Sequence, residues 1–372
     1  MEQDPDPNAR AAVRAEARGN VPIASRPMKS VVIHPPHRLS VEDTRPDAMG
    51  PGEVTVAVRA GGICGSDLHY YRHGGFGTVR VKEPMVLGHE AAGEIAAVAE
   101  DVTGLTVGDR VAINPSRPCR ACRFCLEGLP NHCENMRFFG SAMMFPHVNG
   151  AFRERLVCDA AQCEAVPDDV SFEELALCEP LSVVLHGLKR VGSLLQKRVL
   201  VTGSGPIGAL AVATACHFGA EEIVVTDVAP EPLAVACRLG ADRTVDVASR
   251  PDELAAYGAG KGTFDVLFEC SGNERALRDA IAVMRPRGAV VQLGIFGGEV
   301  SVPINLVVSK ELQLLGSFRF HEEFPAAAKL IGSGRIDLKP LLTRTYPVEE
   351  AVAAFEAAGD RRATMKVHLA FG

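Results

Sequence analysis

Residues 198–208 read Arg-Val-Leu-Val-Thr-Gly-Ser-Gly-Pro-Ile-Gly, an apolar strand that runs directly into a glycine-rich turn. The turn has the G-x-G-x-x-G spacing, and the apolar stretch Pro206 to Phe218 behind it is typical of a helix. Backbone N–H groups at the start of such a helix can bind a pyrophosphate. The predicted cofactor-binding residues of this turn are Gly203, Gly205, Pro206, Ile207 and Gly208.

The turn alone is weak evidence for a dinucleotide site, and an Asp at the end of the following strand strengthens it. Asp227 stands 19 residues after Gly208, close to the position that reads the adenosine ribose of a dinucleotide. A carboxylate there accepts hydrogen bonds from the ribose hydroxyls and repels a 2′-phosphate, and no Arg or Lys follows until Arg238. The sequence therefore predicts NAD rather than NADP, with a plain turn residue as the alternative for Asp227.

The wider pattern predicts an α/β protein of two domains. After residue 184, apolar strands alternate with helical stretches, which indicates a doubly wound parallel sheet. Residues 29–181 carry short alternating runs between Gly and Pro, which indicates an antiparallel β-rich domain. The last fifty-odd residues are too few for a third domain. We therefore expect a tail over 1–28, a β-rich catalytic domain over 29–181 completed by 319–372, and a dinucleotide domain over 182–318.

Composition excludes several classes of partner. A net charge of −7 without a dense basic run argues against nucleic acid. The uncharged run 199–220 is cut by Gly and Pro, and the first 27 residues lack an apolar secretion core, so no membrane or export segment is predicted. Eleven Cys in 372 residues are too few for a disulfide scaffold and favour a reducing, cytoplasmic location. A small-molecule substrate is expected.

Four cysteines crowd into one short loop. Cys119, Cys122, Cys125 and Cys133 have the spacing C-x2-C-x2-C-x7-C. Four thiolates so close along the chain can close a tetrahedral shell around one zinc ion, and a closed shell is structural because it leaves no open position for a substrate. This pattern is specific, and the alternative of unmetallated surface cysteines is a poor one.

A second set of candidate ligands is scattered along the chain. It comprises Cys64, His89, Glu90 and Glu179. A single Cys or His is more often a buried structural residue than a ligand, so their spacing alone does not establish a site.

These segments, in this order, resemble the zinc-containing medium-chain dehydrogenases over nearly all of residues 28–372. The resemblance implies a GroES-like catalytic domain, a Rossmann domain and a catalytic zinc between them. It implies that Cys64 and His89 bind zinc and that either Glu90 or Glu179 is the third ligand. Glu179, where ethanol-oxidising members have Cys, and Tyr70 place the chain in the sorbitol-dehydrogenase branch, with Tyr70 near the substrate.

The resemblance also implies roles around the zinc. Asp67 would orient the imidazole of His89, and Ser66 and His69 would relay the proton of the alcohol to solvent. For Asp67 the alternative is loop capping, and for His69 it is a purely structural role. Zinc would stabilise the alkoxide, and NAD would take the hydride.

Three further stretches, 112–116, 137–152 and 316–320, resemble members that oxidise a secondary alcohol of a sugar acid. Such a substrate needs a cation for its carboxylate, and Arg319 is the first candidate and Arg137 the second. For both arginines the alternative is a salt bridge near the domain boundary. The rival substrates are uncharged polyols such as sorbitol or xylitol, and a rival of another class is a zinc protein without catalysis. Relatives suggest a homotetramer.

Overall fold

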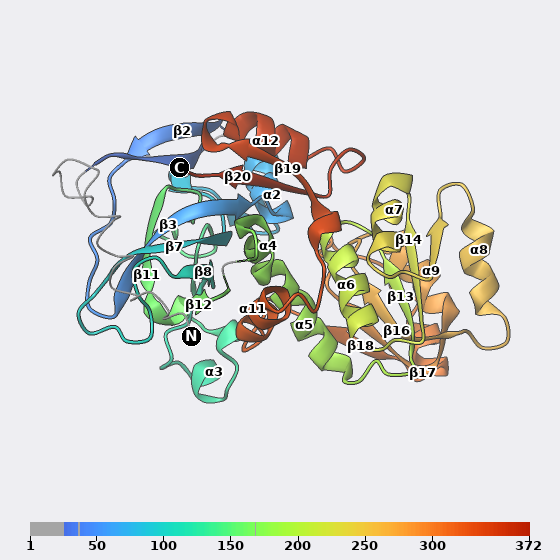
Figure 1. The fold of residues 1–372 in the computed structure, drawn as a ribbon. Helices are drawn as coiled ribbons and strands as arrows, with labels where there is room; N and C mark the ends of the chain where they lie inside the picture. The colour runs from blue at the N-terminus through green and yellow to red at the C-terminus, as the bar shows by residue number, and fades with distance from the viewer. Residues whose placement is uncertain (1–25, 36–37, 168) are drawn as a thin grey trace, which may run out of the picture.

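The computed structural model describes residues 26–35, 38–167 and 169–372, and these form two lobes side by side (Figure 1). Residues 1–25 of the predicted tail lie outside the described residues. The end of the tail was predicted at Met28, but Met28 is the buried first residue of strand β1.

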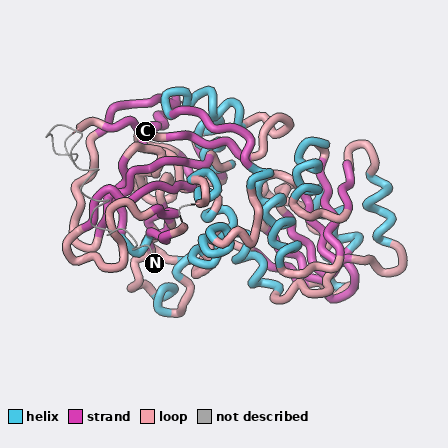
Figure 2. Tube along the Cα trace, viewed as in Figure 1, coloured by secondary structure: helices cyan, strands magenta, loops and turns pink. Residues whose placement is uncertain are grey.

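The first lobe is built on a seven-stranded sheet, with strand order β12-β8-β7-β3-β20-β19 and β11 also paired with β3. Its strands are β3 (Glu53–Gly62), β7 (Glu90–Val98), β8 (Arg110–Ile113), β11 (Arg155–Asp159), β12 (Cys163–Ala165), β19 (Leu342–Pro347) and β20 (Lys366–Ala370). Residues along β3 alternate between buried and half-buried, as the alternating sequence predicted. The two C-terminal strands pair into this sheet beside β3, and Figure 2 shows them among the other strands of the lobe.

Smaller elements surround this sheet. The short strands are β1 (Met28–His34), β2 (Arg38–Thr44), β4 (Gly75–Phe76), β5 (Val79–Arg80), β6 (Met85–Val86), β9 (Ser116–Arg117) and β10 (Arg137–Phe138). The helices are α2 (Gly65–His73), α3 (Arg123–Leu126), η2 (Pro130–His132), η3 (Ala160–Gln162), α4 (Phe172–Ala176), α11 (Phe324–Gly332), η5 (Lys339–Leu341), η6 (Val348–Glu350) and α12 (Ala351–Ala358). The core of the lobe centres on Phe152, Phe355 and Phe371.

The second lobe is a six-stranded parallel sheet of order β15-β14-β13-β16-β17-β18. The strands β13 to β15 follow one another toward one edge and β16 to β18 toward the other, so the strand order reverses between β13 and β16, which pair in parallel. Its strands are β13 (Arg198–Thr202), β14 (Glu222–Asp227), β15 (Arg243–Asp246), β16 (Phe264–Glu269), β17 (Met284–Gln292) and β18 (Gln313–Gly316). The helices are α5 (Cys178–Val191), α6 (Pro206–His217), α7 (Pro230–Arg238), α8 (Pro251–Ala255), η4 (Ala256–Gly258), α9 (Glu274–Val283) and α10 (Ile304–Ser309). Ligands of such sheets bind beyond the carboxyl ends of the strands where the order reverses.

Helix α5 joins the two lobes. It contacts β7 of the first lobe and α6 and β17 of the second, and α11 packs along it. The boundary expected at residues 181 and 182 therefore falls inside a helix rather than in a loop. Among the described residues, no helix is long and apolar enough to cross a membrane.

Candidate active site

Three side chains from two segments converge in the first lobe. The ligand atoms of Cys64, His89 and Glu90 lie within 4.8 Å of one another. The sheet register explains this, because Glu90 at the start of β7 pairs with Gly62 at the end of β3, two residues before Cys64. A side chain at Gly62 would collide with the carboxylate of Glu90 and with Lys366. A residue larger than glycine at this position would therefore displace the side chains of Glu90 and Lys366.

Asp67 ties these segments together. Its carboxylate accepts hydrogen bonds from the Cys64 N–H at 3.0 Å and from the Gly88 N–H at 3.3 Å. Its Oδ1 also lies 3.8 Å from Nδ1 of His89. Burial raises the pKa of Asp67, and the nearby imidazole opposes that shift. Asp67 thus lies beside Nδ1 of His89, beyond the length of a normal hydrogen bond, where its charge can orient the ring.

Lys366 is the residue of this site that sequence reasoning missed. Its ammonium contacts the Glu90 carboxylate and donates to the Ile63 carbonyl at 3.2 Å, and both charged side chains are almost fully buried. Burial disfavours the ammonium, but Glu90 and Cys64 outweigh burial and raise the pKa of Lys366. A lone Lys at the start of the apolar closing strand was the only signal in the sequence.

Glu179, in the first turn of α5, is not one of the three side chains whose ligand atoms lie within 4.8 Å of one another, but its charge interacts with that of each of them. Burial raises its pKa to about 8, and Glu90 and Cys64 add to the shift, whereas His89 opposes it. Burial, together with Glu90, likewise raises the pKa of the Cys64 thiol to about 12. Several acidic groups are therefore crowded into a buried space with too little positive charge. A divalent cation would relieve this crowding, and Glu90 Oε1, which has no hydrogen-bond partner among the described residues, could bind it.

Helix α2 carries the two predicted proton-relay residues. Ser66 is half-buried in its first turn, and His69, one turn later, is exposed. Burial and the neighbouring His73 and Arg361 lower the pKa of His69, so the ring is neutral at pH 7. The structure thus places both residues on the helix that begins directly after Cys64, with the imidazole of His69 accessible to solvent.

The four predicted cysteine ligands meet in a projecting loop of the first lobe, around α3 and η2, which we call the four-cysteine lobe. The sulfur atoms of Cys119, Cys122, Cys125 and Cys133 lie within 4.8 Å of one another. Backbone N–H groups of Ala121 and Cys122 lower the pKa of Cys119 to about 6, which favours the thiolate form. Four sulfurs at this separation fit a tetrahedral zinc ion.

The glycine-rich turn lies between β13 and α6 as predicted. Gly203 has φ 82°, and a Cβ at Gly208 would collide with the Gly203 carbonyl, so both positions require glycine. Asp227 ends β14 beside this turn, where its Oδ2 accepts from the Ser204 N–H at 2.6 Å. Its Oδ1 accepts from the N–H groups of Val228 and Ala229. The Asp227 carboxylate is thereby fixed next to the expected pyrophosphate site.

The two candidate arginines differ sharply in position. The Arg319 guanidinium lies 4.2 Å from the centre of the Phe138 ring, which in turn lies 5.6 Å from the centre of the His89 ring. Burial lowers the pKa of Arg319, while Glu179 and Tyr70 oppose that shift, so both lie near the cation. Arg137 precedes Phe138 on β10 and is exposed, because successive residues of a strand point to opposite faces. The structure therefore does not bring Arg137 to the cluster.

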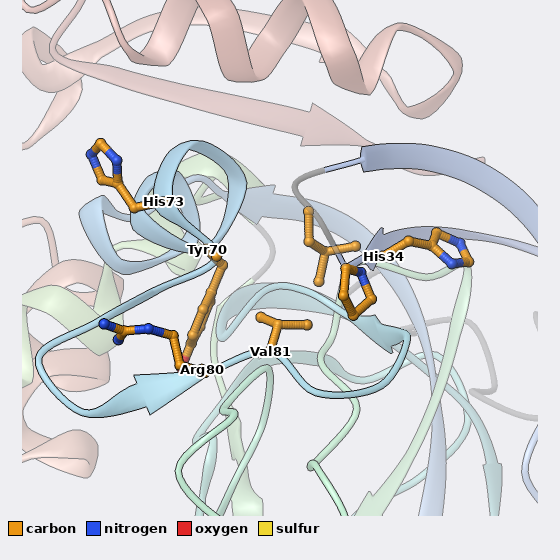
Figure 3. A pocket seen from close by; sticks show the side chains of 8 residues that line it. His34, Tyr70, His73, Arg80 and Val81 are labelled. Carbon is orange, nitrogen blue, oxygen red and sulfur yellow. The ribbon is translucent and has the colours of Figure 1, made fainter.

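Tyr70 is a buried residue of α2. Its hydroxyl accepts from the Ala142 N–H at 3.0 Å, and burial raises its pKa. Its ring also lines a cavity of about 280 Å³, which contains no residue of the metal cluster. Figure 3 shows the Tyr70 ring beside Val81, with the rings of His34 and His73 extending away in opposite directions. Arg80 also lines this cavity, and its guanidinium donates to the carbonyls of Gly77 and Val79, so the lining combines apolar and basic side chains.

Comparison with known proteins supports the geometry. Residues 50–168 match the family described as "Alcohol dehydrogenase GroES-like domain", and residues 206–333 match "Zinc-binding dehydrogenase". The chain is 42% identical over 316 residues to L-idonate 5-dehydrogenase (NAD(P)(+)) of Escherichia coli strain K12, which covers 85% of this chain and 91% of that protein. The chain belongs to the zinc-containing medium-chain dehydrogenase family.

Other relatives agree with this assignment. Sorbitol dehydrogenase of Gallus gallus is 40% identical, with 88% of this chain and 92% of that protein covered. The crystal structure of L-idonate 5-dehydrogenase from Escherichia coli is similar with a TM-score of 0.88 at 40% identity, covering 92% of this chain and 98% of that one. The predicted GroES-like and Rossmann architecture is thus confirmed, and this dehydrogenase is a zinc-dependent enzyme that uses a nicotinamide cofactor.

Proposed function

We propose that this dehydrogenase oxidises the C5 alcohol of L-idonate to give 5-keto-D-gluconate, with NAD as the hydride acceptor. The observation that carries the proposal is the Arg319 guanidinium, which has no carboxylate within 4 Å among the described side chains and is separated from His89 by a single ring. In L-idonate the carboxylate and the carbon to be oxidised are four bonds apart. Arg319 can therefore bind the carboxylate while the alcohol reaches the metal cluster.

The first group of residues in the proposed reaction would hold the catalytic zinc and orient its ligands. Cys64, His89 and Glu90 would hold the catalytic zinc, with Glu179 beside the alcohol. When bound, zinc supplies the charge that stabilises an alkoxide, and NAD accepts the hydride. Asp67, whose Oδ1 lies 3.8 Å from Nδ1 of His89, would help to orient that ring.

The proton of the alcohol needs a path out of the buried site. Ser66 would pass it toward His69, whose exposed and neutral ring can accept the proton and release it to solvent. Tyr70, fixed by the Ala142 N–H, would form part of the substrate wall near Arg319.

We propose one catalytic and one structural zinc ion, the latter held by the four cysteines. We also propose a preference for NAD, because Asp227 ends β14 beside the glycine-rich turn and a carboxylate at the ribose-reading position repels a 2′-phosphate. The relative from Escherichia coli is named for both cofactors, so the degree of preference is the quantity to measure.

The alternative substrate is an uncharged polyol such as sorbitol or xylitol. The similarity to a sorbitol dehydrogenase favours this alternative, since a polyol needs only the metal cluster and not Arg319. A comparison of charged and uncharged substrates therefore separates the two functions.

The deciding experiment is a pair of arginine variants assayed on L-idonate and on L-iditol, in which a hydroxymethyl group replaces the carboxylate. Arg319→Met should lower kcat/KM for L-idonate roughly ten- to a hundredfold, because a charge-assisted bidentate contact contributes about 1.5–3 kcal/mol. Its kcat/KM for L-iditol should hardly change. Arg137→Met is the matched control and should leave both substrates unaffected. A wild-type enzyme that prefers sorbitol or xylitol over L-idonate would refute the sugar-acid proposal.

We propose further that the protein is a cytoplasmic homotetramer, and that its catalytic domain, which residues 319–372 complete, and its dinucleotide domain meet within helix α5. Its many free cysteines suit a reducing compartment. Strand β18 has an open edge at the end of the parallel sheet, with Leu314 45% exposed, which suits contact with a second copy.

A further inference from the structure

The segment that leads from β18 to α11 crosses from the second lobe to the first, where a loop of the first lobe holds it. It carries Arg319, whose φ of 53° lies in the left-handed region that residues with a side chain seldom adopt. Such a conformation persists only where the surroundings determine it. The contacts of the preceding residue, Phe318, are therefore of interest.

Phe318 contacts two residues of the loop that carries the four cysteines. The Asn131 side chain is 6% exposed, and its Nδ2 donates to the Phe318 carbonyl at 3.1 Å. The His132 ring stacks on the Phe318 ring, with centres 5.8 Å apart and planes at 30°. Both residues belong to η2, which ends immediately before Cys133. The loop thus fixes both the main chain and the side chain of the residue before Arg319.

The guanidinium of Arg319 is in turn held by aromatic rings and a sulfur atom rather than by an ion pair. It lies between the rings of Phe138 and Phe318, at 4.2 and 5.2 Å from their centres, and its Nη2 lies 3.0 Å from Met143 Sδ. No Asp or Glu side chain of the described residues forms an ion pair with it. Its position therefore depends on the ring of Phe318 and on the backbone that Asn131 holds.

We propose that Asn131 and His132 are positioning residues for Arg319, and that the four-cysteine lobe thereby contributes to the selection of an acidic substrate. This inference rests on the proposed role of Arg319 as the carboxylate-binding residue. It gives the lobe a second role besides closing a metal shell, because η2 links its cysteines directly to the substrate side of the site.

The test uses the full-length, zinc-loaded enzyme and two variants of Asn131. Asn131→Leu removes the donor at similar size, and Asn131→Ala removes it without introducing a charge. Each should raise KM for L-idonate roughly tenfold, as expected for the loss of one buried hydrogen bond, with little change in kcat. The kcat/KM for L-iditol should stay within about twofold, and the zinc content should not change. Glu127→Gln, an exposed change in the same lobe, is the control.

A double variant separates positioning from a general structural effect. Asn131→Leu should add nothing to Arg319→Met on L-idonate, because the residue that it positions is already gone. Equal losses on both substrates, or release of zinc, would show that the contact is merely structural and would overturn the inference. An unchanged KM alongside a selective loss in Arg319→Met would overturn the inference and leave the proposed function intact. Without any selective loss in Arg319→Met, the proposed function itself fails.

Discussion

The buried pair of Lys366 and Glu90 gives the sharpest quantitative prediction. Lys366→Met keeps the apolar length of the side chain but removes the ammonium that contacts the Glu90 carboxylate. The side chains of Lys366 and Glu90 are only 3% and 1% exposed, so water cannot replace the lost partner. Removing one member of a buried ion pair typically costs about 3–5 kcal/mol, because the other charge is left without compensation. We expect a loss of that size in the free energy of unfolding of the metal-free protein.

Bound zinc should reduce this loss. The Glu90 carboxylate lies within 4.8 Å of the ligand atoms of Cys64 and His89, so a divalent ion held by them would supply positive charge next to it. Lys366→Met should therefore be destabilised more in the presence of a chelator than in excess zinc.

Denaturant unfolding followed by circular dichroism, with and without chelator, measures both quantities. The control is Lys366→Met combined with Glu90→Gln, which removes both charges and should recover at least half of the lost stability. A loss below about 1 kcal/mol in the single variant, or no recovery in the double variant, would refute the view that this pair is a compensated buried charge.

Three further predictions concern other parts of the molecule. Cys122→Ser should release one of two zinc equivalents and lower the melting temperature, since three thiolates cannot close the shell; elemental analysis that finds both ions retained would contradict this. Asp227→Ala should lose much of the preference for NAD, and an unchanged ratio of kcat/KM for NAD and NADP would place specificity elsewhere. Burial opposes ionisation of Glu323, but His186, the His321 N–H and Lys189 hold its pKa at about 2. Since this value lies below the ordinary 4.5, the carboxylate contributes roughly 3 kcal/mol above pH 4.5 that is lost as the pH falls toward 2. Glu323→Gln should reduce the loss of unfolding free energy between pH 4.5 and pH 2, measured by denaturant unfolding. An unchanged loss in this variant would show that Glu323 does not cause it.

Local patterns account for the features that the sequence determined by itself. The strand 198–202 and the helix from Pro206 are placed as predicted, because apolar periodicity and the glycine spacing are properties of neighbouring residues. The four cysteines could be grouped for the same reason, as they lie within one short loop. The family resemblance rested on such local segments and their order, and it is confirmed.

Contacts between distant segments were decided only by the tertiary structure. Lys366 meets Glu90 because β20 pairs with β3 and β3 pairs with β7, a register that no local pattern encodes. The sequence offered both Arg137 and Arg319 as cations for the substrate carboxylate. The structure distinguishes them, because on β10 the ring of Phe138 contacts His89 while Arg137 is exposed to solvent. The sequence thus determined which local units form and which ligand types they carry. Which charges face one another was decided by packing, because buried charges are stabilised by partners that lie far away along the chain.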